Sequence, residues 1–218
     1  MLYRLAVFDF DGTIVDTAGP IVAAAQATLR AAGHDEPDPK AVRTLVGLPL
    51  DVVLNSLAGG DRPAAELVDL CASYRSSFAR IAPGRTELFE GVREAILQLA
   101  GTGIGLAVAT SRNMSSLERV LEEHGLRRHF SKLITDGCVT HGKPHPEMLK
   151  RLLEHFGVSR DETVMIGDTV YDLRMGHAAG TATCAVTYGF HPAAELLAEE
   201  PTHVADHARD IPGVLEVA

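Results

Sequence analysis

At 218 residues, with 46% apolar and 22% charged residues, the chain has the proportions of a globular protein. It is long enough for one large domain, or for a core domain with a smaller insertion. Its formal net charge of -9 argues against a nucleic-acid backbone as the main partner, because such binders present a basic surface. No segment approaches the ~18 uninterrupted apolar residues of a membrane span, and the first residues do not form a secretory signal.

Cysteine usage indicates a reducing compartment. The chain contains three isolated cysteines, Cys71, Cys138 and Cys184. Because they lack C-x-x-C spacing, they indicate neither a disulfide framework nor a thiolate zinc site. We therefore expect a cytoplasmic protein.

The first predicted element is a buried strand that ends in two acids. Four apolar residues, Leu5 to Phe8, are typical of a central strand in a parallel sheet covered by helices. Asp9 and Asp11 follow at its carboxyl end, where open α/β sheets bind ligands, and side chains two apart point the same way. Gly12 allows a tight turn. The alternative is a strand followed by an ordinary Asp-Gly turn.

The next part of the chain is helical. We expect no strand between about residue 17 and residue 102, although strands should recur every 25 to 40 residues or so in this architecture. The predicted helices are Ile21–Ala32, Ala41–Val46, Leu50–Leu57 and Ala64–Arg80. The simplest interpretation is an inserted helical cap over residues 17–84, rather than helices that pack on the faces of the sheet.

A second buried strand, Ile104–Thr110, follows a predicted helix at Leu88–Leu99. It leads into a helix that starts near Met114, so hydroxyls and free backbone N–H groups meet at one junction, as in many phosphate sites. Thr110 occupies the last strand position and is a candidate ligand. Ser111 stands beside it, and its alternative role is that of a helix N-cap.

A loop over residues 136–146 follows a short strand, Lys132–Thr135, and precedes a helix, Glu147–Phe156. Lys143 lies in this loop between a glycine and a proline, which restricts its backbone, although a single lysine is more often a surface residue. The flanking histidines, His141 and His145, have a spacing that could suit a metal. They have no third ligand of obvious fit nearby, so we expect no zinc site there.

A further apolar strand, Thr163–Ile166, ends at Asp168, with Asp172 one helical turn later. Both carboxylates can point at one place. Taken alone, they could be a turn acid and an acid stabilised by the helix dipole. The remaining predicted elements are a helix ending at Ala179, a strand at Ala182–Tyr188, a helix within residues 189–197, a strand at His203–Ala205 and helical turns at Asp210–Val217.

Four of these stretches together resemble the motifs of the haloacid dehalogenase superfamily. They are D-x-D-G-T from Asp9, the strand-end Thr110, K-P-x-P from Lys143, and G-D-x-x-x-D with Asp168 and Asp172. The resemblance covers the whole chain and is greatest to the phosphoglycolate-phosphatase-like branch with a small helical cap. It implies an α/β fold with a Rossmann-like parallel sheet flanked by helices. The core domain would be residues 1–16 and 85–218, and the all-α cap domain residues 17–84.

The resemblance also implies a mechanism. Asp9 would attack phosphorus and form an aspartyl-phosphate, and Asp11 would act as general acid and base. Thr110, Ser111 and Lys143 would bind the phosphate. The metal would be Mg²⁺, because oxygen ligands select a hard cation. Its expected ligands are Asp9, the backbone carbonyl of Asp11, Asp168 and Asp172, the last either as a ligand or as an orienter of bound water.

These residues predict a Mg²⁺-dependent phosphatase for a small phosphomonoester such as phosphoglycolate, a sugar phosphate or a nucleotide. The acid at Asp11 argues against halide displacement. Ile21 and Leu50 stand where related mutases carry histidine and arginine, and Lys40 is the only lysine that could form a Schiff base in the cap. The alternatives are a phosphotransferase, mutase or pyrophosphatase, and a non-catalytic binding module that keeps the fold for a partner.

The expected partner is a small phosphorylated metabolite, with no nucleic acid and no membrane, and the chain is a monomer or a homodimer. Substrate contacts are expected from the cap and from the residue after the second motif. The candidates are Arg43, Gly47, Arg75 and Arg112. Each is also a common kind of residue on a helix surface.

Overall fold

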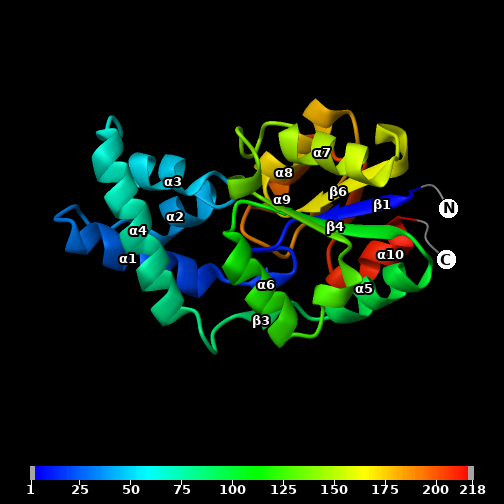
Figure 1. Ribbon diagram of the computed structural model, residues 1–218, viewed down its shortest axis with the longest axis horizontal. Coiled ribbons are helices and arrows are strands. Elements are labelled where there is room, and N and C mark those ends of the chain that lie inside the picture. Colours follow the sequence, from blue (N-terminus) through cyan, green and yellow to red (C-terminus); the bar gives the residue numbers. More distant parts are fainter. Residues whose placement is uncertain (1–2, 216–218) are drawn as a thin grey trace.

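The computed structural model describes residues 3–215 and is built around a six-stranded parallel sheet in the order β5-β4-β1-β6-β7-β8 (Figure 1). The strands are β1 (Leu5–Phe8), β4 (Gly105–Thr110), β5 (Lys132–Thr135), β6 (Thr163–Gly167), β7 (Ala182–Val186) and β8 (His203–Ala205). β1 pairs with β4 on one side and with β6 on the other. The chain therefore adds strands first on one side of β1 and then on the other, and open α/β sheets bind ligands where the strand order reverses in this way.

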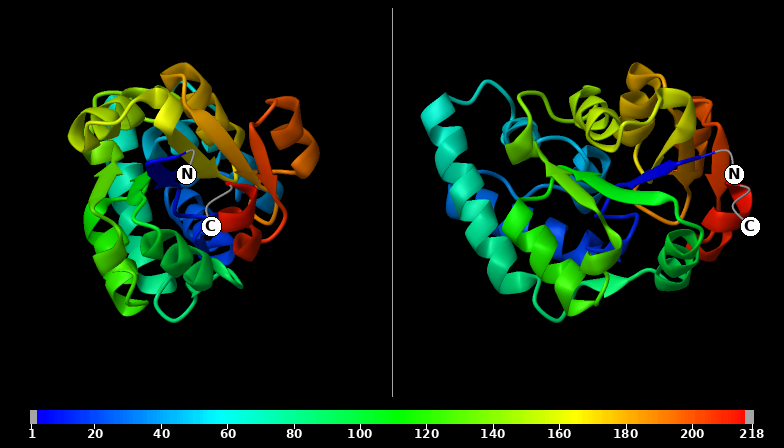
Figure 2. Two further views of the ribbon diagram at one scale, coloured as in Figure 1. Left: turned by 90° about the vertical axis from the view of Figure 1, so that its right-hand side faces the viewer. Right: turned by 45° about the vertical axis from the view of Figure 1, so that its right-hand side comes forward.

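Helices cover both faces of the sheet, as Figure 2 shows. On one face, Ala6 and Phe8 pack with α5 (Val92–Gly101), α6 (Met114–Glu123) and α10 (Ile211–Val214). On the other, Leu5 and Val7 pack with α7 (Glu147–Phe156) and α8 (Val170–Ala179), and α9 (Ala193–Ala198) packs beside α8. Alternate residues of β1 thus point to opposite apolar layers, which is why the whole strand is apolar. The 3₁₀ turns are η1 (Arg127–His129), η2 (Asp136–Cys138), η3 (Arg160–Glu162) and η4 (Ala208–Asp210).

Four helices lie beyond the carboxyl ends of the strands and pack on one another (Figure 1). They are α1 (Ala18–Ala31), α2 (Pro39–Leu45), α3 (Leu50–Leu57) and α4 (Ala64–Ile81), and we call them the cap. Leu29 of α1, Leu54 of α3 and Leu70 of α4 share one buried cluster. The cap therefore has a small apolar core of its own. The domain boundaries at residues 17 and 84 stay a prediction.

Two sequence expectations are corrected here. β3 (Glu87–Leu88) pairs antiparallel with β2 (Val15–Asp16), so a strand does occur between residues 17 and 102. The helix predicted at Leu88–Leu99 begins only at Val92, because Gly91 before it is left-handed with φ 81°. A two-residue strand has no periodicity to detect, and its pairing depends on residues far away in the sequence, since Leu88 pairs with Val15.

The end of the chain bears on two further expectations. The strand predicted at Ala182–Tyr188 stops at Val186, and the last predicted turns are a 3₁₀ turn followed by α10. The expectation for residues 216 and 217 lies outside the described residues. None of the helices within residues 3–215 combines the length and the apolar content needed to cross a bilayer.

Candidate active site

Four parallel strands bring polar residues to one edge of the sheet. Asp9 follows β1, Thr110 ends β4, Asp136 follows β5 and Asp168 lies just after β6. Gly12 lies against this group with φ 88°, and a Cβ there would collide with the Asp168 carboxylate. The chain therefore requires glycine at this turn.

Lys143 connects two of the acids predicted from the sequence. Its Nζ lies 2.7 Å from Asp9 Oδ1 and 2.6 Å from Asp172 Oδ1, and the three side chains are almost wholly buried. Burial alone would lower the pKa of Lys143, but the Asp172 and Asp9 carboxylates outweigh it and raise that pKa above its usual range. The lysine is therefore a fixed positive charge beside Asp9.

Asp168 and Asp172 are held by hydrogen bonds that orient them. Asp168 accepts from Thr13 Oγ1 at 2.8 Å and from the backbone N–H of Phe190 at 2.8 Å. Asp172 Oδ2 accepts from Thr169 Oγ1 at 2.7 Å in a capping box at the start of α8, while Oδ1 accepts from Lys143. Asp172 thus carries an ammonium group on one oxygen and two Thr169 donors on the other, whereas each Asp168 oxygen accepts one neutral donor, and this difference favours a positioning role for Asp172 over direct metal ligation.

The buried acids fit a divalent cation. Ligand oxygens of Asp9, Asp168 and Asp172 lie within 4.8 Å of one another. Burial and the Asp172 carboxylate raise the pKa of Asp9 to about 7 against the opposing effect of Lys143, and burial and Asp9 raise the pKa of Asp168 well above its usual range. One lysine does not compensate three buried carboxylates, and an oxygen-only donor set of this kind suits Mg²⁺.

Asp11 lies apart from this cluster and pairs with Arg112. One of its oxygens accepts both from Arg112 Nη1 at 2.5 Å and from Thr17 Oγ1 at 2.7 Å. The Arg112 side chain is only 4% exposed, and its guanidinium lies over the rings of Phe10 and Phe78, the latter from the cap. Sequence reasoning placed Asp11 and Arg112 in the site but not in contact.

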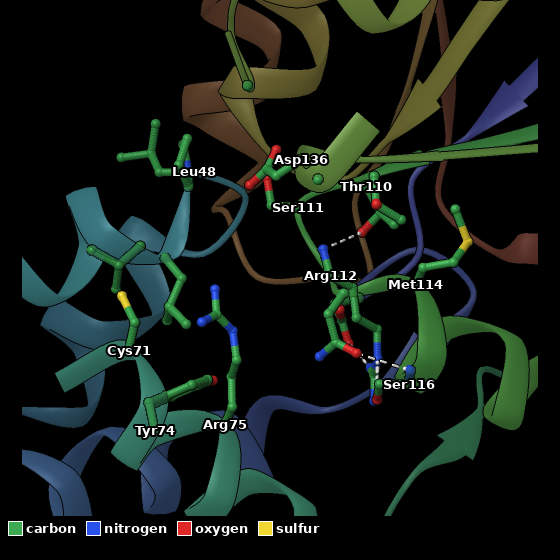
Figure 3. Close-up of a pocket in the computed structure, with 18 of the residues that line it drawn as sticks. Leu48, Cys71, Tyr74, Arg75, Thr110, Ser111, Arg112, Met114, Ser116 and Asp136 are labelled. Carbon is green, nitrogen blue, oxygen red and sulfur yellow. Dashed lines mark hydrogen bonds and ion pairs between the residues drawn. The ribbon is translucent and has the colours of Figure 1, made fainter. Parts of the chain in front are cut away.

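A cleft of about 1110 Å³ separates the cap from the core, and Figure 3 shows Thr110 on its core side. Asp9 and Asp11 also line this cleft. Thr110 Oγ1 accepts from the backbone N–H of Arg112 at 3.2 Å. Ser111 Oγ donates to the carbonyl of Gly47 at 2.7 Å, so its hydroxyl links the core to the cap.

The candidate substrate contacts divide into two groups. Gly47, Arg75 and Arg112 line the cleft. Arg43 of α2 is exposed and is not among the lining residues of the cleft. A substrate contact at Arg43 stays a prediction.

A family model matches most of the chain, with all four motifs inside the matched segment. The model is that of the haloacid dehalogenase-like hydrolases, and it covers residues 6–186. The chain is a haloacid dehalogenase-like hydrolase. It belongs to the phosphoglycolate-phosphatase-like branch and is a phosphoric monoester hydrolase by class.

Named relatives of this hydrolase align along almost its whole length. It is 36% identical to the protein named "Probable phosphatase IndB" of Dickeya dadantii, over 96% of this chain and 92% of that one. It is 32% identical to a 5'-nucleotidase of Pseudomonas aeruginosa, over 98% and 96% of the two chains. A solved hydrolase from Pseudomonas syringae has the same fold, with a TM-score of 0.89 at 21% identity and 98% of each chain covered.

One surface cluster of the hydrolase differs from the sequence expectation. Glu147 lies with His141 and His145, with ligand atoms within 4.8 Å, so the pair does have a third group nearby. However, backbone N–H groups of Thr140 and His141, together with the Arg151 guanidinium, lower the pKa of Glu147 to about 2. These bonds account for the position of the carboxylate without a metal.

Sequence reasoning missed Asp136 of the hydrolase. It lines the cleft, and its Oδ1 is buried with no hydrogen-bond partner among the described residues. Burial raises its pKa to about 6, although Lys143 opposes the shift. Its place after β5, equivalent to that of Asp9 after β1, was the signal that could have identified it.

Proposed function

We propose that this hydrolase cleaves a small phosphomonoester in a Mg²⁺-dependent reaction through an aspartyl-phosphate on Asp9. The observation that carries the proposal is the position of Asp9. Its carboxylate lies at the carboxyl end of the central strand, in the wall of the cleft and 2.7 Å from Lys143. A carboxylate and an anionic phosphate repel each other. The positive charge of Lys143 reduces this repulsion, so that the Asp9 carboxylate can attack the phosphate.

Asp9, Asp168 and the backbone carbonyl of Asp11 would hold Mg²⁺, with Asp172 beside them. No hydrogen bond among the described residues uses that carbonyl. The cation would supply charge neutralisation at the phosphate. Thr110 and Ser111, with the N–H groups that precede α6, would bind the transferring oxygens together with Lys143.

In the first step, Asp9 forms a bond to phosphorus as the bond to the leaving oxygen breaks, and Asp11 gives that oxygen a proton. In the second step, the Asp11 carboxylate takes a proton from water, which attacks phosphorus and releases Asp9. Arg112 and Thr17 hold Asp11 on the cleft side of the site. They therefore set the direction from which the proton is given.

The test is phosphate release from a panel of phosphomonoesters, with and without Mg²⁺, for the wild type, Asp9→Asn and the matched control Asp35→Asn at an exposed loop residue. We expect release that needs Mg²⁺, is lost in Asp9→Asn and is kept in the control. Mg²⁺-independent release, or an active Asp9→Asn, would contradict the mechanism.

The same assay separates the alternative functions. Transfer of the phosphoryl group to added alcohols in place of water would identify a phosphotransferase, and release of phosphate from pyrophosphate alone would identify a pyrophosphatase. No release from any compound would favour the binding module.

A further inference from the structure

The cleft next to Asp9 is larger than a small phosphorylated acid needs. Its volume is about 1110 Å³, whereas clefts that bind drug-sized ligands measure roughly 300–1,000 Å³. A phosphoryl group and a two-carbon acid at Asp9 would leave most of this space to water. The size therefore indicates a bulky leaving group.

Apolar side chains form much of the wall away from Asp9. They are contributed by both the cap and the core, and they include Val46, Leu48, Val52, Tyr74, Phe78 and Met114. Val52 on α3 is 44% exposed, although it is a valine. Tyr74 stacks on Phe78 with ring centroids 6.1 Å apart and an angle of 20° between the planes. These apolar side chains can desolvate an apolar or aromatic body.

Arg75 adds a polar group to the cap side. In Figure 3 it extends from α4 into the space between Leu48 and the core residues Ser111 and Arg112. No ion pair or hydrogen bond of its side chain occurs among the described residues, in contrast to Arg119 of the same cleft, which pairs with Glu123 at 2.6 Å. A guanidinium in this position can stack on a ring or donate to ring carbonyls and nitrogens.

We propose that the leaving group is of nucleoside size and carries a planar ring with hydrogen-bond acceptors, which lies against Val52 and Tyr74 and is contacted by Arg75. This assignment rests on the proposed phosphatase function and narrows its substrate. A two-carbon phosphorylated acid, by contrast, would cover little of this apolar wall.

The test compares ribonucleoside 5'-monophosphates with phosphoglycolate. For the wild type we expect kcat/KM to favour the nucleotides by about 100-fold or more, because burying a whole ring should discriminate at least as well as a single methylene, which gives roughly 10- to 200-fold. Val52→Trp fills the cleft and should lower kcat/KM for nucleotides about tenfold or more, chiefly through KM, and leave phosphoglycolate within about twofold. The matched control is Val68→Trp on α4, where the valine is 67% exposed and outside the cleft wall, and it should change neither substrate.

A binding measurement separates this inference from the proposed function. Calorimetry of Asp9→Asn, which needs no turnover, should detect nucleotide binding that is weakened about tenfold by adding Val52→Trp or Arg75→Gln. If the wild type binds nucleotides but does not hydrolyse them, the proposed phosphatase function is wrong, whereas the proposed ring-binding site is supported. A preference for phosphoglycolate, or equal loss of both substrates in a folded Val52→Trp, would overturn the inference.

Discussion

Lys143 Nζ lies 2.7 Å from Asp9 Oδ1, and neither side chain is more than 3% exposed. The same ammonium pairs with Asp172, so one cation is shared by two buried carboxylates. Such an arrangement is costly to break, because removal of one partner leaves uncompensated charge in the interior.

Replacing this lysine should therefore affect both stability and turnover. We expect Lys143→Met to lower the free energy of unfolding by about 3–5 kcal/mol and to abolish phosphate release. Urea unfolding and a phosphate assay measure the two effects. Lys150→Met, at an exposed position on α7, is the control and should change neither. Adding Asp9→Asn to Lys143→Met should recover part of the lost stability, and a further loss of stability would disagree with the pairing.

Mg²⁺ should stabilise the fold through the acid cluster. At a concentration about 1,000 times its Kd, the cation would add ~4 kcal/mol, measured as a rise in Tm. We expect Asp168→Asn to lose this rise and Asp172→Asn to keep part of it, because Asp172 already pairs with the Lys143 ammonium, whereas Asp168 accepts only from neutral donors. Chelation should return the wild type to its metal-free Tm and stop turnover. Equal effects of the two variants would assign Asp172 as a full ligand.

Arg112 should matter most for poor leaving groups. Its pairing with Asp11 positions the proposed proton donor, and an alkyl leaving oxygen needs that proton while p-nitrophenolate does not. We expect Arg112→Ala to lower kcat for alkyl phosphates about 100-fold or more, with p-nitrophenyl phosphate affected far less. Arg112→Lys should recover part of the loss. An equal loss on both substrates would indicate a structural role only.

Asp136 should make stability depend on pH. Its pKa is about 6 in the folded protein against an ordinary 3.8, so the folded state binds more protons than the unfolded state between these values. Its contribution is fully present below pH 3.8 and is lost as pH rises through about 6, a change of up to roughly 3 kcal/mol.

Asp136→Asn cannot ionise and should therefore be more stable than the wild type at pH 8 but similar to it at pH 4. Tm measured across this range tests the sign of the effect. Asp35→Asn, at an exposed acid, should show no such difference. A wild type more stable than Asp136→Asn at pH 8 would mean that Asp136 has an ionic partner there.

The sequence predicted those elements whose signal is local. The helices Leu50–Leu57 and Glu147–Phe156 were predicted with the bounds that the structure shows. Their signals are local, because each helix has its own apolar spacing and a proline directly before it. β3 was missed because two residues carry no pattern. The family and the parallel sheet were predicted correctly, since buried strands that end in acids are a local signal repeated along the chain.

For the site, the sequence indicated which residues lie at strand ends, but it did not indicate their hydrogen-bond or ion-pair partners. Asp9 and Asp168 could be placed because the carboxyl ends of parallel strands meet. The contact between Asp11 and Arg112, 101 residues apart, and the buried Oδ1 of Asp136 depend on how loops pack, which no local pattern encodes. Arg43 is exposed and does not line the cleft, so its substrate contact stays a prediction.

The most direct test of the central claim is chemical trapping of the acyl phosphate. The enzyme is mixed with substrate and Mg²⁺, quenched in acid and reduced with borohydride, which converts an aspartyl-phosphate to homoserine. Mass spectrometry of the tryptic peptide Leu5–Arg30 then locates the change. Homoserine in place of Asp9, absent without substrate, is the predicted result. An unmodified Asp9 in an enzyme that releases phosphate would contradict the account, as would modification of Asp11.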